Sequence, residues 1–445
     1  MSTPNHRPAS AVLALVLGLS LLPTGPVLAE QIRLDPALAQ PYLLAGQKQA
    51  TYLRVGLDAK ALRNAERPPV NVSIVIDRSG SMSGQKLRRA KEAAIMAVDR
   101  LHPDDIISVV AYDHKVTVLV PATKARDRAN IVAGIRRLYA GGNTALFAGV
   151  SKGAEEVRKF AEPNRVNRVV LLSDGLANVG PSSPSELGSL GGSLGREGIG
   201  VTTIGLGLDY NEDLMTQLAQ RSEGNHFFAA TAADLRRGFE LEFGVGLAVA
   251  AKEIAITVEC AKGIRPIRVI NTEADIFGRK VIAHLSQIYA SRQAYVLLEV
   301  EVPAGEAGGV RDLAKVSVSY ASMQSMATEN LSRRLSVRFS GSPAVVERNI
   351  NRPVMADVMM HLANERYKMA LELRDQGKIH RAREVLQDNA RLLEKQSRKY
   401  KSQRLYDFSQ SNYRSMGNLE KKKWKKERKQ MRDEQLELDE PAAAY

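Results

Sequence analysis

The chain has 445 residues, of which 44% are hydrophobic and 25% are charged, so it is long enough for two or three globular domains. Lysine and arginine total 63 against 49 aspartates and glutamates, and this net charge of +14 favours anionic partners without indicating a fold. The only cysteine, Cys260, excludes an internal disulfide and a metal cage built from cysteines.

Residues 1–29 have the pattern of a secretory signal peptide. The apolar run "AVLALVLGLSLLP" is followed by small residues at Val27 and Ala29, which predicts cleavage after Ala29. The run is shorter than a membrane-spanning helix needs, and no later segment is long and apolar enough to cross a bilayer. We therefore expect an exported mature chain, periplasmic or secreted, without a transmembrane segment.

Residues 70–243 alternate apolar strands with amphipathic helices. Several strands, such as "VNVSIVID" and "NRVVLLSD", are apolar nearly throughout, which is typical of strands buried on both faces. The alternation predicts an α/β domain with a mostly parallel sheet covered by helices on both faces. In such sheets, ligands bind at the loops that leave the carboxyl ends of the strands.

The spacing of apolar residues along the sequence changes in the regions that flank 70–243. Short alternating strands across 244–345 predict a β-sandwich, and the N-terminal segment 30–69 has the same character and is expected to add strands to it. Residues 346–400 predict a helical hairpin around Gly377, which resembles one tetratricopeptide repeat. The region 401–445, basic and then acidic, is expected to be a poorly ordered tail with at most a helix under its basic block.

The stretch "DRSGS" follows the first strand of the α/β region and places Asp77, Ser79 and Ser81 at alternate positions of a glycine-containing loop. Hard divalent cations prefer oxygen ligands, and three such side chains can point at one centre. Two more oxygen donors, Thr144 in "GGNTAL" and Asp174 in "LLSDG", follow at other loops. Serine, glycine and aspartate also dominate ordinary turns, so "DRSGS" alone does not distinguish a turn from a metal site. Together, the five residues predict a divalent-cation site.

At these residues the sequence resembles the von Willebrand factor type A domain. Asp77, Ser79, Ser81, Thr144 and Asp174 match the family's metal-ion-dependent adhesion site in order and spacing. The resemblance covers about residues 70–243 and implies a doubly wound sheet with Mg²⁺ at its carboxyl edge, Mn²⁺ or Ca²⁺ being alternatives. It also implies that Thr144 and Asp174 exchange direct and water-mediated contacts with the ion. The flanks resemble those of bacterial secreted proteins with this domain and of the inter-α-trypsin inhibitor heavy chains.

The resemblance implies a protein-binding or adhesion module whose metal ion captures an Asp or Glu carboxylate of a partner protein. A Mg²⁺-assisted hydrolase is an alternative, but the sequence has no H-E-x-x-H pattern, no phosphate-binding "GxxxxGK[ST]" loop and no evident catalytic base, so we expect no enzyme. Another alternative is an envelope scaffold in which the basic block 421–432, with Trp424, binds an anionic surface. Nucleic acid is not an expected partner of an exported chain.

Overall fold

The structure is a computed structural model that describes residues 31–61, 68–162, 165–174, 177–243 and 249–439. The predicted signal peptide lies outside the described residues. Within the described ranges, no helix has the length and apolar character that a membrane span requires.

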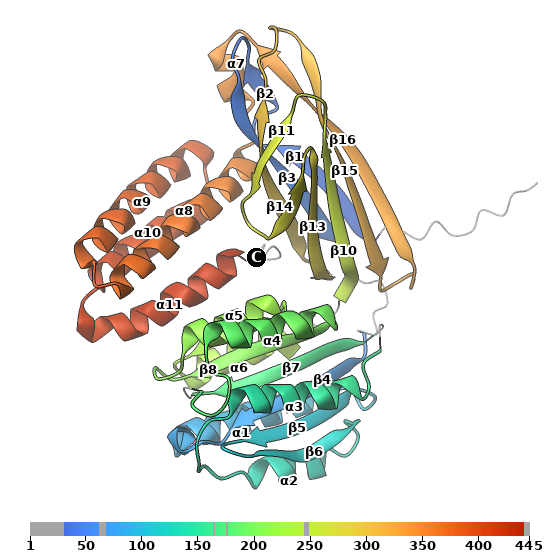
Figure 1. The fold of residues 1–445 in the computed structure, drawn as a ribbon, viewed down its shortest axis with the longest axis vertical. Coiled ribbons are helices and arrows are strands. Elements are labelled where there is room, and N and C mark those ends of the chain that lie inside the picture. The colour runs from blue at the N-terminus through green and yellow to red at the C-terminus, as the bar shows by residue number, and fades with distance from the viewer. Residues whose placement is uncertain (1–30, 62–67, 163–164, 175–176, 244–248, 440–445) are drawn as a thin grey trace, which may run out of the picture. The chain divides into compact units, whose positions relative to one another are not determined.

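An α/β domain forms the middle of the chain (Figure 1). Within the described residues its sheet has six strands in the order β6-β5-β4-β7-β8-β9, and only β6 runs antiparallel to its neighbour. This confirms the α/β fold class with a mostly parallel sheet. The strands are β4 (Val70–Asp77), β5 (Ile106–Tyr112), β6 (Val116–Lys124), β7 (Val166–Ser173), β8 (Ile199–Leu206) and β9 (His226–Ala229). The helices are α1 (Gln85–Arg100), α2 (Arg128–Arg136), α3 (Leu146–Arg158), α4 (Pro184–Arg196), α5 (Glu212–Arg221) and α6 (Ala232–Phe243), with a short 3₁₀ turn η1 (Gly80–Met82) before α1.

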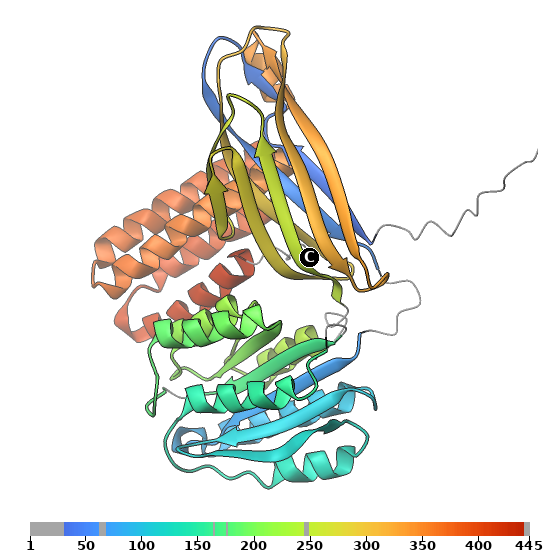
Figure 2. The same cartoon turned by 45° about the vertical axis from the view of Figure 1, so that its right-hand side comes forward.

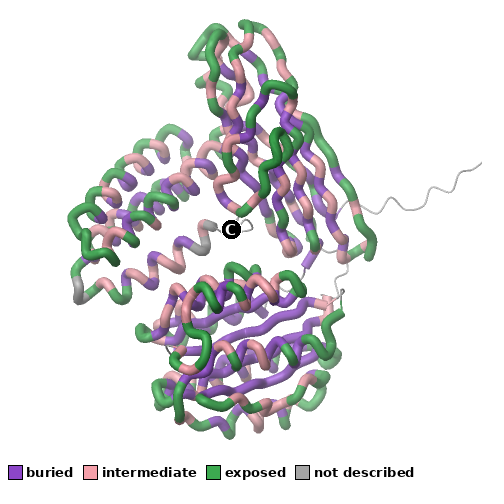
Figure 3. Tube along the Cα trace, viewed as in Figure 1, coloured by how far each residue is buried: buried purple, intermediate pink, exposed green. Residues whose placement is uncertain are grey.

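Helices cover both faces of this sheet, so the sheet is doubly wound. Side chains of α1, α2 and α6 share one core with Ile74 and Ile76 of β4, whereas α3, α4 and α5 share another core with Val75. Every residue of β4 is buried, and Figure 3 shows the central strands buried along their length. Because the faces are closed, the edge formed by the carboxyl ends of the strands is the place where loops can build a site.

Two further sheets pack face to face around one core and form a β-sandwich (Figure 2). Their orders are β1-β3-β14-β11 and β12-β13-β10-β15-β16-β2. The N-terminal strand β3 pairs antiparallel with β14, so the α/β domain is inserted in the sequence between strands of the sandwich. Cys260 is buried in this core, and burial raises the pKa of its thiol to about 11. The strands are β1 (Ile32–Leu38), β2 (Tyr42–Leu44), β3 (Gln49–Ala59), β10 (Val249–Cys260), β11 (Arg265–Val269), β12 (Ala274–Phe277), β13 (Lys280–Tyr289), β14 (Gln293–Val302), β15 (Val310–Ser322) and β16 (Thr328–Ser340).

The last part of the chain is helical. A hydrophobic cluster joins α8, α9, α10 and α11 and includes Tyr367, Leu386, Phe408 and Met431. The helices are α7 (Pro343–Arg348), α8 (Arg352–Asp375), α9 (Ile379–Tyr400), α10 (Gln403–Gly417) and α11 (Lys421–Asp439).

The expectation of a poorly ordered tail over 401–445 was wrong for 403–417, which form α10, whereas the helix allowed under the basic block is α11, which extends over 421–439. The sequence shows the basic charges of α11 but not the carboxylates that neutralise them. Arg428 pairs with Glu212, Asp213 and Asp375, and Lys429 is nearly fully buried against Glu212. These contacts hold α11 to α5 and α8, and they explain why a run of like charge is ordered here.

Candidate functional site

Asp77 ends β4 and is fully buried at the carboxyl edge of the sheet. Its Oδ1 accepts a hydrogen bond from the backbone N–H of Ser79 at 2.8 Å, and its Oδ2 accepts one from the Ser173 hydroxyl at 2.6 Å. Burial raises the pKa of Asp77, and the hydrogen bonds from Ser173 and Ser79 act in the opposite direction. A buried carboxylate fixed in this way is oriented for a cation, which would stabilise its charge.

The two serines of the loop connect Asp77 to the neighbouring strand. The hydroxyl oxygens of Ser79 and Ser81 lie 3.2 Å apart, and the Ser81 hydroxyl donates to Oδ1 of Asp174 at 2.9 Å. Asp174 follows β7, which pairs in parallel with β4, and it is fully buried. The structure therefore brings Asp77, Ser79, Ser81 and Asp174 into one connected cluster of oxygen atoms.

Thr144 lies in the loop before α3 and is 3% exposed. Its N–H donates to the side-chain oxygen of Asn178 at 2.8 Å, and its carbonyl accepts from the N–H of Asn178 at 3.1 Å. Two backbone hydrogen bonds, from Gly80 to Gly142 at 3.0 Å and from Gly141 to Arg78 at 2.8 Å, hold this loop against the loop that carries the serines. Thr144, the fourth predicted donor, thus lies on a segment fixed beside the loop that carries Ser79 and Ser81.

Gly142 is a position in this loop where the backbone requires a glycine. Its φ is +79°, and a Cβ at this position would lie 2.4 Å from Nδ1 of His114. A side chain would therefore meet both backbone strain and a clash.

Lys86 is a residue that the sequence analysis missed. It lies in the first turn of α1, its ammonium group contacts Oδ2 of Asp174, and it is 3.6 Å from Oδ2 of Asp209. Its position nine residues after Asp77, inside a run of basic residues, carries no signal by itself. The contact between Lys86 and Asp174 forms only because β4 and β7, which the two residues follow, are adjacent in the folded sheet.

A third carboxylate, Asp113, follows β5 at the same edge but has its own counter-ion. The guanidinium of Arg78 lies 2.9 Å from its Oδ2, and the N–H of Lys115 donates to its Oδ1 at 2.7 Å. Among the described residues there is no cluster of three or more His, Cys, Asp and Glu side chains with the arrangement of a metal centre. The donor set at the edge is therefore two carboxylates with neutral hydroxyls, which are hard oxygen ligands that suit Mg²⁺.

Two buried histidines have structural hydrogen bonds. His226 contacts the hydroxyls of Thr203 and Tyr210 at 2.8 and 3.2 Å, and His361 contacts the hydroxyl of Tyr295 at 2.9 Å. Burial lowers the pKa of each histidine to about 4. Both rings are therefore neutral near pH 7 and enclosed, unlike a histidine that exchanges protons with a substrate.

Comparison with known proteins defines the class of the α/β domain. Residues 71–239 match the family model of the von Willebrand factor type A domain, and this part of the chain is a von Willebrand factor type A domain, as its motifs predicted. The family is associated with protein interaction and adhesion.

Relatives and solved structures resemble different extents of the chain. An uncharacterized protein of Synechocystis sp. is 34% identical over 200 residues, which are 44% of this chain and 47% of that protein. Inter-alpha-trypsin inhibitor heavy chain H3 of Mus musculus is 28% identical over 170 residues, or 35% of this chain and 18% of that protein. The chain thus spans less than half the length of these relatives. The solved structure of a von Willebrand factor type A protein from Catenulispora acidiphila matches 93% of this chain and 97% of its own, with a TM-score of 0.71 at 17% identity, a similarity of fold.

Proposed function

We propose that this chain is a metal-dependent protein-binding module. Asp77, Ser79, Ser81, Thr144 and Asp174 hold a Mg²⁺ ion, for which Mn²⁺ or Ca²⁺ can substitute. The ion, when bound, supplies a coordination position for an Asp or Glu carboxylate of a partner protein.

The observation that carries the proposal is the cluster of oxygen atoms shared by two neighbouring strand ends. Asp77 is held by hydrogen bonds of 2.6 and 2.8 Å, and Ser81 links its loop to Asp174 at 2.9 Å. Because the ligands are oriented in advance, the loops lose little conformational freedom when they bind a cation.

The charges at the site favour an acidic partner. Asp77 and Asp174 contribute two negative charges, and the hydroxyl donors contribute none. A divalent cation at these ligands retains coordination positions that a partner carboxylate can fill, and the ammonium of Lys86 beside Asp174 adds a positive charge to the site. The bond to that carboxylate is charge-assisted and lies beside fully buried groups, where solvent screening is weak.

The same geometry argues against the hydrolase alternative. The described carboxylates near the site accept hydrogen bonds from serines or form ion pairs with Arg78 and Lys86. None of them is therefore placed as a general base that takes a proton from a nucleophile. We propose that the chain acts by binding rather than by catalysis.

The contacts of α11 also bear on the scaffold alternative. Four of the basic side chains in 421–432, those of Lys425, Arg428, Lys429 and Arg432, form ion pairs with acidic residues of the same chain. These charges are therefore less available to an anionic envelope surface. Export to the periplasm or the medium remains part of the proposal on the pattern of residues 1–29.

The test is to measure Mg²⁺ and Mn²⁺ binding by calorimetry and by the metal-induced rise of the melting temperature, in wild type and in Asp77→Asn. A ligand that binds only the folded state stabilises it according to its concentration relative to Kd, so the wild type should melt higher as metal is added. Asp77→Asn keeps the side-chain shape but removes the charge, and its melting temperature should not respond.

Asp104→Asn is a matched control, because Asp104 is an exposed carboxylate just before β5, at the opposite edge of the sheet. It should bind metal like the wild type. Equal metal binding by Asp77→Asn and wild type would show that the cluster is not the metal site.

A further inference from the structure

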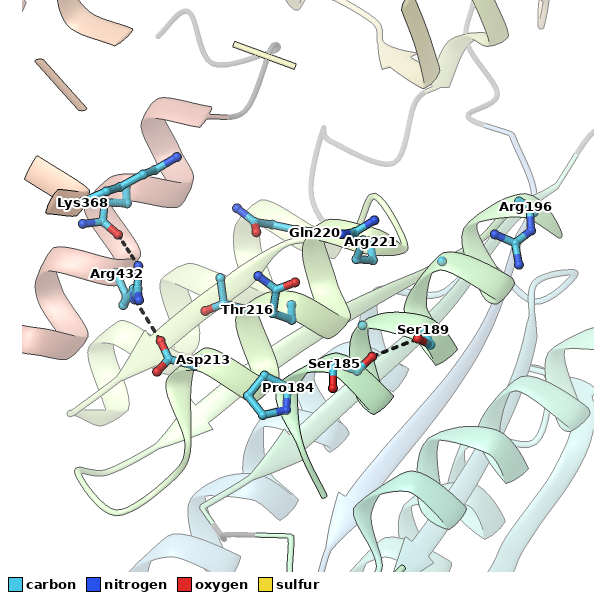
Figure 4. Close-up of a pocket in the computed structure, with 14 residues that line it drawn as sticks. Pro184, Ser185, Ser189, Arg196, Asp213, Thr216, Gln220, Arg221, Lys368 and Arg432 are labelled. Carbon is cyan, nitrogen blue, oxygen red and sulfur yellow. Dashed lines mark hydrogen bonds and ion pairs between the residues drawn. The ribbon is translucent and has the colours of Figure 1, made fainter. Parts of the chain in front are cut away.

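A cleft away from the carboxyl edge has the features of a second binding site. It has a volume of about 770 Å³ and lies between α4 and α5 on one side and α8 and α11 on the other (Figure 4). This volume is within the range of about 300–1,000 Å³ that small-molecule sites occupy.

The charge in the cleft is predominantly positive. Arg196 and Arg221 line it from α4 and α5, and Lys368 and Arg432 from α8 and α11, as Figure 4 shows. Asp213 is the lining residue of opposite charge, and it contacts Arg432 at 2.9 Å as well as the guanidinium of Arg428. The acid is thus already neutralised, and the field that remains attracts anions.

Two buried polar atoms of the lining have no hydrogen-bond partner among the described residues. They are Oγ1 of Thr216, in a residue that is 7% exposed, and Nε2 of Gln435, in a residue that is 3% exposed. Both atoms are buried behind the surface of the cleft, so a ligand would contact the exposed polar side chains of the lining instead.

The lining also restricts the type of ligand. It contains serine, threonine, glutamine and glycine but no aromatic side chain, so it offers no stacking surface for a base and no apolar channel for a lipid chain. At Gly188 and Gly192 no side chain covers the backbone of α4, and an added Cβ would meet no atom closer than 3.5 Å. A hydrophilic ligand can therefore approach the backbone of the helix closely.

We propose that this cleft binds a hydrophilic small-molecule polyanion that carries several phosphate or carboxylate groups. The ligand contacts Arg196 and Arg221 of the α/β domain together with Lys368 of α8, so it stabilises the packing of the C-terminal helices on the α/β domain. This site is separate from the metal cluster and does not depend on it.

The experiment is calorimetric titration of the protein with tripolyphosphate and with citrate, at low ionic strength, after metal ions have been stripped with EDTA and the EDTA has been removed by dialysis, so that neither the metal site nor the chelator takes part. Sucrose serves as a neutral probe. We expect a single site for at least one anion, weakened by salt, and no heat with sucrose. Tripolyphosphate binding alone assigns the site to phosphates, and citrate binding alone assigns it to carboxylates.

The variant Arg196→Gln/Arg221→Gln should weaken binding at least about tenfold, because each arginine can contribute a charge-assisted hydrogen bond. The control Arg236→Gln/Arg237→Gln changes the net charge equally at two exposed arginines of α6 and should bind as the wild type does. A second pair is Gly192→Glu, which places a negative charge beside Arg196 in the cleft, and Gly192→Gln, which adds a neutral side chain of similar size. Only Gly192→Glu should abolish binding. Absence of anion binding at millimolar concentration, or equal weakening in both double variants, would overturn the proposal.

Discussion

Removing the ammonium group of Lys86 should strengthen metal binding. The group contacts Asp174, a proposed ligand, so an incoming cation must compete with it for the same carboxylate. Two unit charges about 4 Å apart interact by about 1 kcal/mol in water and by about 4 kcal/mol at an effective dielectric constant of about 20. Because the Lys86 side chain is 30% exposed and Asp174 is fully buried, the pair lies between these limits. The lower limit corresponds to about fivefold in affinity, so Lys86→Met should bind Mg²⁺ at least about fivefold more tightly than wild type.

The assay is calorimetric titration of EDTA-stripped protein with Mg²⁺, supported by the melting temperature with and without metal. Lys86→Met should melt below the wild type without metal, because Asp174 loses its counter-ion, and should gain more from Mg²⁺. Lys262→Met is the control, because it removes the same charge from an exposed position in the sandwich. An unchanged or lower Mg²⁺ affinity in Lys86→Met would refute the competition between ammonium and metal.

Three further predictions concern the loop, the C-terminal helix and pH. At Gly142 the φ is +79°, and an added Cβ would lie 2.4 Å from His114. Gly142→Ala should therefore lose at least about 1–2 kcal/mol of stability and bind Mg²⁺ more weakly in calorimetry. Unchanged affinity would contradict the role of this loop. Arg428→Gln removes the partner of three carboxylates and should cost roughly 3 kcal/mol in urea unfolding followed by the fluorescence of the only tryptophan, on α11. Arg398→Gln, at an exposed pair, should cost well under about 1 kcal/mol, and equal costs would disprove the docking account. Burial lowers the pKa of His226 to about 4, so the unfolded chain takes up a proton at higher pH than the folded chain does. The contribution of His226 to the free energy of unfolding is therefore fully present above about pH 6.5 and decreases by about 3 kcal/mol as the pH falls from 6.5 to 4. Replacing His226 with Gln should flatten the stability curve in this window, and an unchanged slope would show that another group titrates there.

The α/β domain was predictable because its signals are local. The apolar composition of "VNVSIVID" reflects burial on both faces of the sheet, and β4 is buried at every position. The order of the strands, by contrast, depends on which neighbours pair across the sheet, and no single segment of sequence carries that information.

The tail shows how the same reasoning can fail. A block such as "KKKWKKERK" is solvated unless acidic groups from distant parts of the chain face it. Glu212 and Asp213 lie more than 200 residues earlier, and they meet Arg428 only after α5 and α11 have packed. A charge pattern therefore predicts order only when its partners are known.

The candidate site divides in the same way. Asp77, Ser79 and Ser81 are recognisable because they lie within five residues. Thr144 is recognisable because it follows a Gly-Gly pair at the start of a helix, and Asp174 because it directly follows an apolar strand. Lys86 has no such motif, and its importance follows from a tertiary contact with Asp174. The cleft between α4, α5, α8 and α11 depends on four helices at once and had no signal in the sequence.

The central claim is that a metal ion held at Asp77 binds a carboxylate of a partner protein. Its most direct test is affinity capture from the native extract, with immobilised wild type in Mg²⁺, with wild type in EDTA, and with Asp77→Asn in Mg²⁺, followed by elution with acetate at constant ionic strength. We predict a partner that only wild type in Mg²⁺ retains and that acetate, but not chloride, releases. Retention of the same proteins in all three cases, unaffected by acetate, would contradict metal-bridged binding.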